Sequence, residues 1–158
     1  MPLPIVLDNT VLTNFALVKH TAVVLRLWPT ACKTADTMAE YQNGASLGRV
    51  PTQAWSELPI VWLSETELSL AVSLSPRQGA GERTCLAVAY ERHGLFVSDD
   101  RDARLSAQRL GLRITGTLGV LALSVKRKLL SRKAANDTLT AMIASGYRSP
   151  FDRLDSLL

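Results

Sequence analysis

Acidic side chains follow two short apolar runs that have the composition of buried strands. Asp8 follows the run PIVL, and Asp99 and Asp100 follow the run LFVS. Glu82 begins a third segment, whose apolar residues recur at helical spacing. Carboxylates gathered without His or Cys favour Mg²⁺ or Mn²⁺ over zinc, because these hard cations prefer oxygen ligands. The acids are therefore candidates for a divalent-metal site.

The chain alternates between short strand-like runs and longer helical stretches. This alternation predicts βαβ units, and hence a three-layer α/β/α sandwich with a mostly parallel central sheet, formed as a single domain over residues 1–158. We expect strands at 4–7, 31–34, 59–63, 95–98 and 112–115. We expect helices at 11–18, 22–28, 35–45, 64–74, 82–93, 101–110, 117–130 and 134–144, and a further short helix within 149–158.

Ligands bind beyond the carboxyl ends of the strands in open α/β sheets, and the strand-end acids are predicted to meet there. Crowded carboxylates raise one another's pKa unless a cation compensates them. Each acid also has a purely structural interpretation. Asp8 is placed to cap the first helix, a contribution of about 1 kcal/mol. Asp99 with Asp102 has the spacing of a capping box, and Glu82 suits the first turn of a helix.

The composition excludes several classes of protein. With 47% hydrophobic and 20% charged residues, the chain has ordinary globular usage, which excludes disorder as the main state. Its apolar runs are too short to span a bilayer, and no signal peptide is readable, so we expect a cytoplasmic protein. Cys32 and Cys85 lack metal-site spacing and are expected to be reduced, buried thiols. His20 and His93 complete neither a zinc site nor a catalytic triad.

The net charge of +4 is unevenly distributed along the chain. Residues 1–100 carry 7 Lys and Arg against 10 Asp and Glu, whereas residues 101–158 carry 11 against 4. This asymmetry indicates either an anionic partner, nucleic acid first, or a solvated basic helix surface. The densest basic stretch is 126–133, which contains five basic residues.

Four segments together resemble a known family. They are VLDNTVLTNF (6–15), GERTCLAVA (81–89), LFVSDDRDAR (95–104) and LGLRITGTLGVL (110–121). In this order and spacing they resemble PIN-domain ribonucleases, most closely the VapC-like prokaryotic toxins. The resemblance extends over nearly the whole chain.

The resemblance implies roles for particular residues. It makes Asp8, Glu40, Glu82 and Asp100 the catalytic, metal-binding acids, with Asp99 as an alternative to Asp100. Many family members have Asp where this chain has Glu82, and the longer side chain changes the expected metal geometry. The residues that support the site would be Thr10 and Asn14, and the residues that bind RNA would be Arg101, Arg104, Lys126, Arg127 and Lys128.

The resemblance also implies a function and partners. The protein would be a Mg²⁺- or Mn²⁺-dependent endoribonuclease that hydrolyses phosphodiester bonds of single-stranded or structured RNA. It would be the toxin of a toxin–antitoxin pair, held inactive by an antitoxin protein and forming a homodimer.

Near the C-terminus lies an apolar stripe, expected to pack on its own domain or on a second chain: Phe151, Leu154, Leu157 and Leu158.

Two other functions remain open from the sequence. One is a catalytically silent PIN fold that acts as a binding or regulatory module. The other is a haloacid-dehalogenase-like phosphatase, because the segment DNTVL (8–12) is superficially similar to the opening motif of that family. That family requires a second Asp two positions after the nucleophile, where this chain has Thr10.

Overall fold

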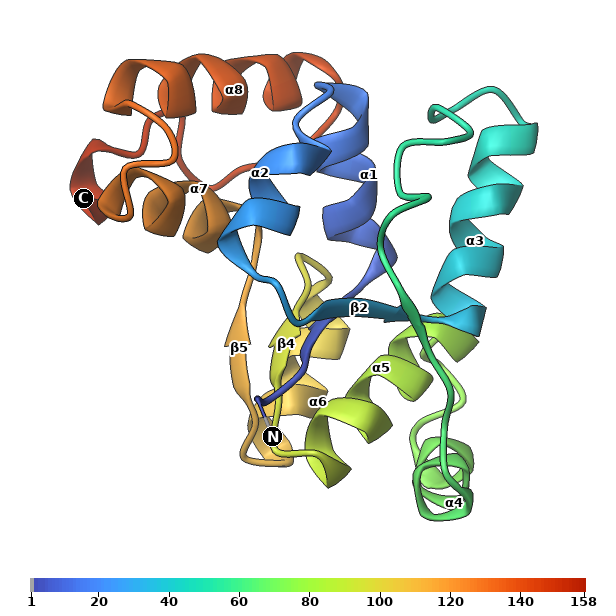
Figure 1. The fold of residues 1–158 in the computed structure, drawn as a ribbon. Helices are drawn as coiled ribbons and strands as arrows, with labels where there is room; N and C mark the ends of the chain where they lie inside the picture. The colour runs from blue at the N-terminus through green and yellow to red at the C-terminus, as the bar shows by residue number, and fades with distance from the viewer. Residues whose placement is uncertain (1) are drawn as a thin grey trace.

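A computed structural model describes residues 2–158 of the chain. Its centre is a five-stranded sheet in which every neighbouring pair is parallel (Figure 1). The strands are β1 (Ile5–Leu7), β2 (Ala31–Thr34), β3 (Ile60–Val61), β4 (Leu95–Val97) and β5 (Arg113–Thr115). The helices are α1 (Asn9–Leu17), α2 (Thr21–Leu27), α3 (Ala35–Ser46), α4 (Glu65–Ser73), α5 (Ala80–Glu91), α6 (Arg101–Arg109), α7 (Thr117–Lys126) and α8 (Arg132–Ala144), followed by a 3₁₀ turn, η1 (Asp155–Leu157).

The strand order β3-β2-β1-β4-β5 places β1 and β4 side by side at the centre of the sheet. The chain runs outward from β1 through β2 to β3 and then returns to β4 on the other side of β1. Such a reversal of direction creates a crevice at the carboxyl ends of the two central strands. Leu7 is paired with Val97, so the residues that follow these two positions emerge next to one another.

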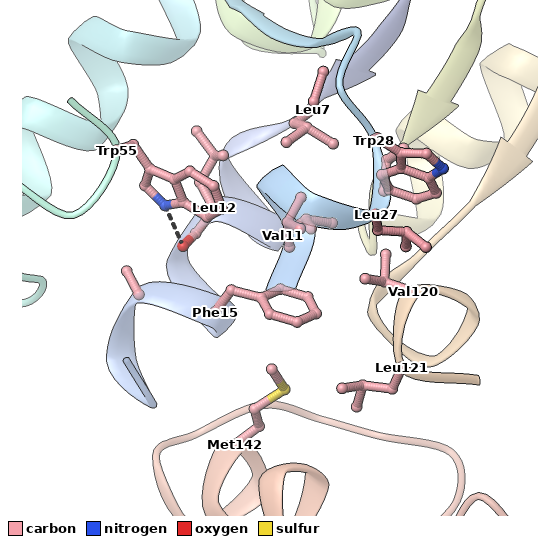
Figure 2. Close-up of a cluster of buried hydrophobic side chains, with 14 of the residues drawn as sticks. Leu7, Val11, Leu12, Phe15, Leu27, Trp28, Trp55, Val120, Leu121 and Met142 are labelled. Carbon is pink, nitrogen blue, oxygen red and sulfur yellow. Dashed lines mark hydrogen bonds between the residues drawn. The ribbon is translucent and has the colours of Figure 1, made fainter. Parts of the chain in front are cut away.

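The central strands are buried on both faces, and their alternating side chains enter two separate cores. Leu7 and Val97 join the cluster formed by α1, α2, α7 and α8, part of which is drawn in Figure 2. Val6 and Phe96 face the opposite way and join the cluster beneath α5 and α6. The predicted three-layer α/β/α sandwich is therefore confirmed.

Some element ends differ from those predicted. Helix α7 ends at Lys126 instead of residue 130, because Lys128 adopts a left-handed conformation with φ 60°. At the end of α5, His93 and not Gly94 takes the left-handed conformation (φ 54°) that stops the helix. Gly94 is instead required for close packing, since a Cβ there would lie 2.4 Å from the carbonyl oxygen of Pro4.

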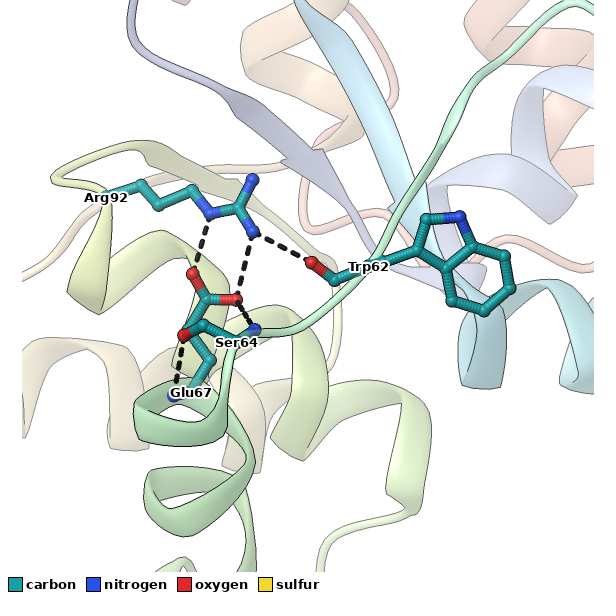
Figure 3. A network of polar contacts seen from close by, with 4 residues as sticks. All are labelled: Trp62, Ser64, Glu67 and Arg92. Atoms are coloured by element: carbon teal, nitrogen blue, oxygen red, sulfur yellow. Dashed lines mark hydrogen bonds and ion pairs between the residues drawn. The ribbon is translucent and has the colours of Figure 1, made fainter.

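A polar network fixes α4 against the end of α5 (Figure 3). Ser64 and Glu67 form a capping box at the start of α4. The buried Glu67 carboxylate also accepts two hydrogen bonds from the guanidinium of Arg92, at 2.7 and 3.1 Å. Arg92 donates a further bond to the carbonyl of Trp62 (3.0 Å), while the Trp62 ring stays exposed. The short β3 is thereby anchored to the body of the domain.

Trp55 holds the long connection between α3 and β3 against α1. Its ring is 1% exposed, and its Nε1 donates to the carbonyl of Leu12 at 2.9 Å (Figure 2). The buried ammonium of Lys33 donates to the carbonyl oxygens of Trp55 and Leu58. Burial lowers the pKa of Lys33, since desolvation disfavours its charged form. These bonds satisfy the carbonyls of a connection that has no strand partner at this point.

Among residues 2–158, no helix has the length and apolar character needed to cross a membrane.

Substitutions of Trp55 and Trp62 test the packing of this connection. Trp55→Ala should lower the free energy of unfolding by about 3–5 kcal/mol, because it leaves a cavity and an unpaired carbonyl. Trp62→Ala should change it by no more than about 0.5 kcal/mol, because the ring is 73% exposed. Urea unfolding followed by circular dichroism measures both, and equal losses would contradict the packing role of Trp55.

Candidate metal-binding active site

Asp8 lies directly after β1 and is 1% exposed. It is the N-cap of α1, where its Oδ1 accepts from the backbone N–H of Asn9 at 2.8 Å. Its Oδ2 accepts from the hydroxyls of Ser98 (2.6 Å) and Thr10 (3.2 Å). Burial raises the pKa of Asp8, these bonds lower it, and the nearby Asp100 raises it again. Asp8 is thus both a cap and a buried carboxylate facing other acids.

Ser98 links the ends of the two central strands. Its hydroxyl donates to Asp8 and also accepts the backbone N–H of Asp100 at 3.0 Å. Asp100 is the N-cap of α6, where its Oδ1 accepts from the N–H of Ala103 at 2.8 Å. The second oxygen of Asp100 has no hydrogen bond to the described part of the chain, residues 2–158. One carboxylate oxygen of Asp100 is therefore available to a ligand at the crevice.

Asp99 has a different environment from its neighbour. Its Oδ1 accepts from the backbone N–H of Thr117 at 2.8 Å, and its Oδ2 accepts from the Thr117 hydroxyl and from Nδ2 of Asn14 at 2.9 Å. Asp99 thus connects the start of α7 to α1. The predicted capping box of Asp99 with Asp102 is wrong, because Asp100 is the residue that caps α6.

Glu40 reaches the site from α3. Its Oε1 accepts from the backbone N–H of Gly81 at 3.0 Å, in the first turn of α5. A Cβ at position 81 would lie 2.5 Å from this oxygen, so only glycine allows the carboxylate so close. The bond lowers the pKa of Glu40, but burial raises it more strongly, and Asp8 raises it further. The positive end of the α5 dipole therefore faces a carboxylate from another helix.

Glu82, the residue after Gly81, is the most strongly coupled of the acids. Burial, together with the smaller effects of Asp100, Asp8 and Glu40, raises its pKa to about 7. A backbone hydrogen bond with Gly79 lowers it only partly. The electrostatic influence of all three other acids on Glu82 places the four carboxylates in one region of the protein.

The charge of the four acids is not neutralised by ion pairs. Within residues 2–158, no Lys or Arg forms a salt bridge with them. The same residues contain no group of three His, Cys, Asp or Glu side chains positioned to share one metal ion. The set has the right chemistry for a hard cation, since it is all carboxylate, and hydroxyls or amides donate to the oxygens of Asp8, to Oε1 of Glu40 and to Oδ1 of Asp100.

The basic residues expected to contact RNA belong to two different parts of the structure, the start of α6 and the end of α7. Arg104 is half-buried on α6, and its Nη1 donates to the carbonyl of Ser98 at 3.0 Å. Arg101 is exposed at the start of the same helix. Lys126 ends α7, and the exposed residues after it are Arg127 and Lys128. Arg104 is the cation attached directly to the strand end that carries the acids.

The sequence patterns did not identify two residues that are important for the geometry of this site. Ser98 bridges the strand ends, and its position two residues before an N-cap is a recognisable hydroxyl-turn signal. Gly81 permits the approach of Glu40, which no local pattern indicates, because the two positions are 41 residues apart. The predicted supporting residues both contact acids: Thr10 bonds Asp8 and accepts from the N–H of Asp99 at 3.0 Å, and Asn14 bonds Asp99.

Comparison with known proteins adds one finding. A family model described as a PIN domain matches residues 4–158, nearly the full chain. No curated protein and no solved structure matches it. The family match replaces the phosphatase interpretation of the segment that begins at Asp8.

The pKa of Glu82 predicts how stability depends on pH in the absence of metal. The pKa is raised from 4.5 to about 7 on folding, so the protein loses stability as the pH rises through this interval. Glu82→Gln removes the titrating group. In EDTA the variant should melt a few degrees above the wild type at pH 8, and the difference should vanish near pH 4.5.

Glu57→Gln serves as the control, because Glu57 is an exposed glutamate in a turn. It should melt with the wild type at both pH values. A Glu82→Gln difference that stayed constant between pH 4.5 and 8 would contradict the raised pKa of Glu82.

Proposed function

Because the chain belongs to the PIN-domain family, whose members are generally nucleases, we propose that it is a divalent-metal-dependent ribonuclease. The observation that carries the proposal is the group of four carboxylates at the carboxyl edge of the sheet, of which Asp8, Glu40 and Glu82 have raised pKa values. Crowded acids without a cationic partner are expected where a protein binds a metal ion.

The residues proposed to hold the ion are Asp8, Glu40, Glu82 and Asp100. Mg²⁺ or Mn²⁺ bound there would lower the pKa of a coordinated water and neutralise charge on the phosphate as its bond breaks. Asp100 offers an oxygen that has no hydrogen-bond partner among residues 2–158. Glu40 and Glu82 have flexible side chains that can turn toward an ion, whereas Asp8 is held by its three hydrogen bonds.

The protein itself would orient one metal ligand, Asp8, and control the protonation of another, Glu82. Ser98 and Thr10 fix the Asp8 carboxylate, so this ligand would need no reorganisation on binding. Glu82, with a pKa of about 7, carries a proton in a large fraction of the metal-free molecules at neutral pH. Metal binding would release that proton, which makes the affinity for the ion increase with pH.

RNA is proposed as the substrate, on the basis of the family and of the charge distribution. Residues 101–158 carry the excess of Lys and Arg. Arg101, Arg104 and the stretch from Lys126 to Lys128 would hold phosphates on either side of the scissile bond. These contacts are not specific for sequence, so the cleavage site would be selected by other features.

We propose a toxin role with an antitoxin partner as the finer form of this function. An inhibitor that places a basic side chain among the four acids would be attracted by their uncompensated charge. A homodimer is also proposed, but most of the C-terminal stripe is not free to contact a second chain. Leu154 is completely buried and Leu157 and Leu158 pack on the domain's own core, so Phe151 is its exposed member.

A catalytically silent binding module is the second candidate. It is favoured by the absence, within residues 2–158, of three acidic side chains already arranged around one ion. Measured cleavage of RNA by the pure protein separates the two functions.

Substitution of the proposed ligands tests the nuclease. Asp8→Asn and Asp100→Asn should each lower the rate of RNA cleavage in Mg²⁺ or Mn²⁺ by about a hundredfold or more, because each removes a metal ligand. Asp102→Asn, at an exposed position on the same helix as the cap, should cleave at the wild-type rate. Wild-type cleavage by both ligand variants would refute the assignment.

Thermal melting distinguishes the two neighbouring aspartates. A metal concentration of about a hundred times Kd should raise the wild-type Tm by roughly 5–10 °C relative to EDTA. Asp100→Asn should reduce this rise. Asp99→Asn should preserve it while lowering the Tm in EDTA, because Asp99 holds the start of α7. An unchanged rise in Asp100→Asn would place the ion elsewhere.

A further inference from the structure

A cavity of about 650 Å³ lies beside the acidic edge, between β5, α7 and the segment that follows α8. Figure 1 shows α7 and the C-terminal segment next to one another at this side of the molecule. The volume is in the range of sites that bind small organic ligands, roughly 300–1,000 Å³. The lining extends along α7 from Gly116 to Lys126, a helix length of about 15 Å.

The charged lining of the cavity is mainly positive. Arg104, Lys126 and Arg148 contribute three cations, and none of them forms a salt bridge within residues 2–158. Asp99 is the acid in the lining, and both its oxygens are engaged by Thr117 and Asn14. The cavity therefore attracts an anion, in contrast to the acidic edge beside it.

The lining also includes two aromatic side chains from the segment after α8. Phe151 is 44% exposed, although the rest of the C-terminal stripe is packed. Its backbone N–H donates to the hydroxyl of Ser149 at 3.2 Å, and Pro150 between them restricts the chain. Tyr147 is half-buried, and burial raises its pKa, so its hydroxyl stays neutral. A flat ring is thus presented to the cavity by a constrained turn.

The cavity is connected to the acidic edge through the hydrogen bonds of Ser98. Arg104 Nη1 donates to the carbonyl of Ser98, and the hydroxyl of the same Ser98 holds Asp8. Asp99, at the rim, is adjacent in sequence to Asp100. A strand of linked nucleotides that fills the cavity would therefore lie next to the strand end that carries Asp99 and Asp100.

We propose that this cavity binds one nucleotide of a single-stranded RNA next to the phosphodiester that is cleaved. The base would stack on Phe151, and the phosphate would be held by Arg104, Lys126 and Arg148. A nucleotide is the ligand class that combines a flat ring with an anion, and bases within a duplex are not free to stack on a protein side chain. The inference rests on the proposed function and adds to it a base-binding subsite.

Binding of short RNA in EDTA tests the subsite without any cleavage. The probes are a fluorescein-labelled RNA octamer and an abasic strand of the same length and charge, followed by fluorescence anisotropy. Phe151→Ala should weaken octamer binding by roughly five- to a hundredfold and leave abasic binding within about twofold, because only the octamer has bases to stack. Lys126→Gln should weaken both strands, because it removes a phosphate contact.

The controls are matched in residue type and exposure. Tyr90 is 42% exposed and Arg113 is exposed. Both line a separate pocket near the amino ends of β4 and β5, so Tyr90→Ala and Arg113→Gln should change neither affinity beyond about twofold. Phe151→Trp should retain octamer binding, because it keeps an aromatic face, and Phe151→Leu should not.

Several results would overturn the inference. They are equal octamer affinity of Phe151→Ala and Tyr90→Ala, equal weakening of both strands by Phe151→Ala, equal binding by the Trp and Leu variants, or no RNA binding by the wild type. Failure of the proposed function is a separate outcome. RNA binding that depends on Phe151, in a protein that leaves RNA intact with Mg²⁺ or Mn²⁺, would reject the nuclease and retain the subsite.

Discussion

Mutual repulsion among four carboxylates is the constraint that shapes the carboxyl edge of this sheet. Asp8, Glu40, Glu82 and Asp100 influence one another electrostatically, and no basic side chain among residues 2–158 forms an ion pair with them. The groups that surround this negative charge are dipoles. Hydroxyls and backbone amides donate to the carboxylates, and the first turn of α5 faces Glu40. Dipoles reduce the repulsion without neutralising the negative charge.

The neighbouring residues Asp99 and Asp100 show how strand geometry separates two chemically identical groups. Successive side chains at a strand end point to opposite faces of the sheet. Asp99 faces the layer of α1 and α7, where hydrogen bonds occupy both of its oxygens. Asp100 faces the layer of α5 and α6, caps α6 and couples to Glu82. One aspartate therefore joins two helices, and the other remains available at the crevice.

Two regions of opposite charge adjoin at Ser98. The acids lie on one side of it, and Arg104 leads from its carbonyl to the cationic cavity along α7. In the proposed nuclease these regions have complementary tasks, since one would hold the metal and the other would hold the substrate strand. The separation matters physically, because the cations of the cavity attract a phosphate strand whether or not a metal ion is bound at the acidic edge.

The sequence by itself determined the fold class, the order of the elements and the position of Asp8, Asp99 and Asp100 at strand ends. These features depend on local periodicity and on short-range capping and turn preferences, which a single chain displays directly. The resemblance to PIN domains, carried by four motifs, likewise required only the sequence. Element ends were less accurate, because residues such as His93 and Lys128 end helices in left-handed conformations that are uncommon for their types.

Only the tertiary structure decided which groups each acidic side chain contacts. The contact between Glu40 and Gly81 joins positions far apart in the chain, and the bonds of Asp99 depend on α1 and α7 packing on the same face. The cavity beside them likewise exists only after the segment following α8 folds back along α7. Such features depend on non-local packing, and local sequence patterns carry no information about which distant backbone groups a side chain will meet.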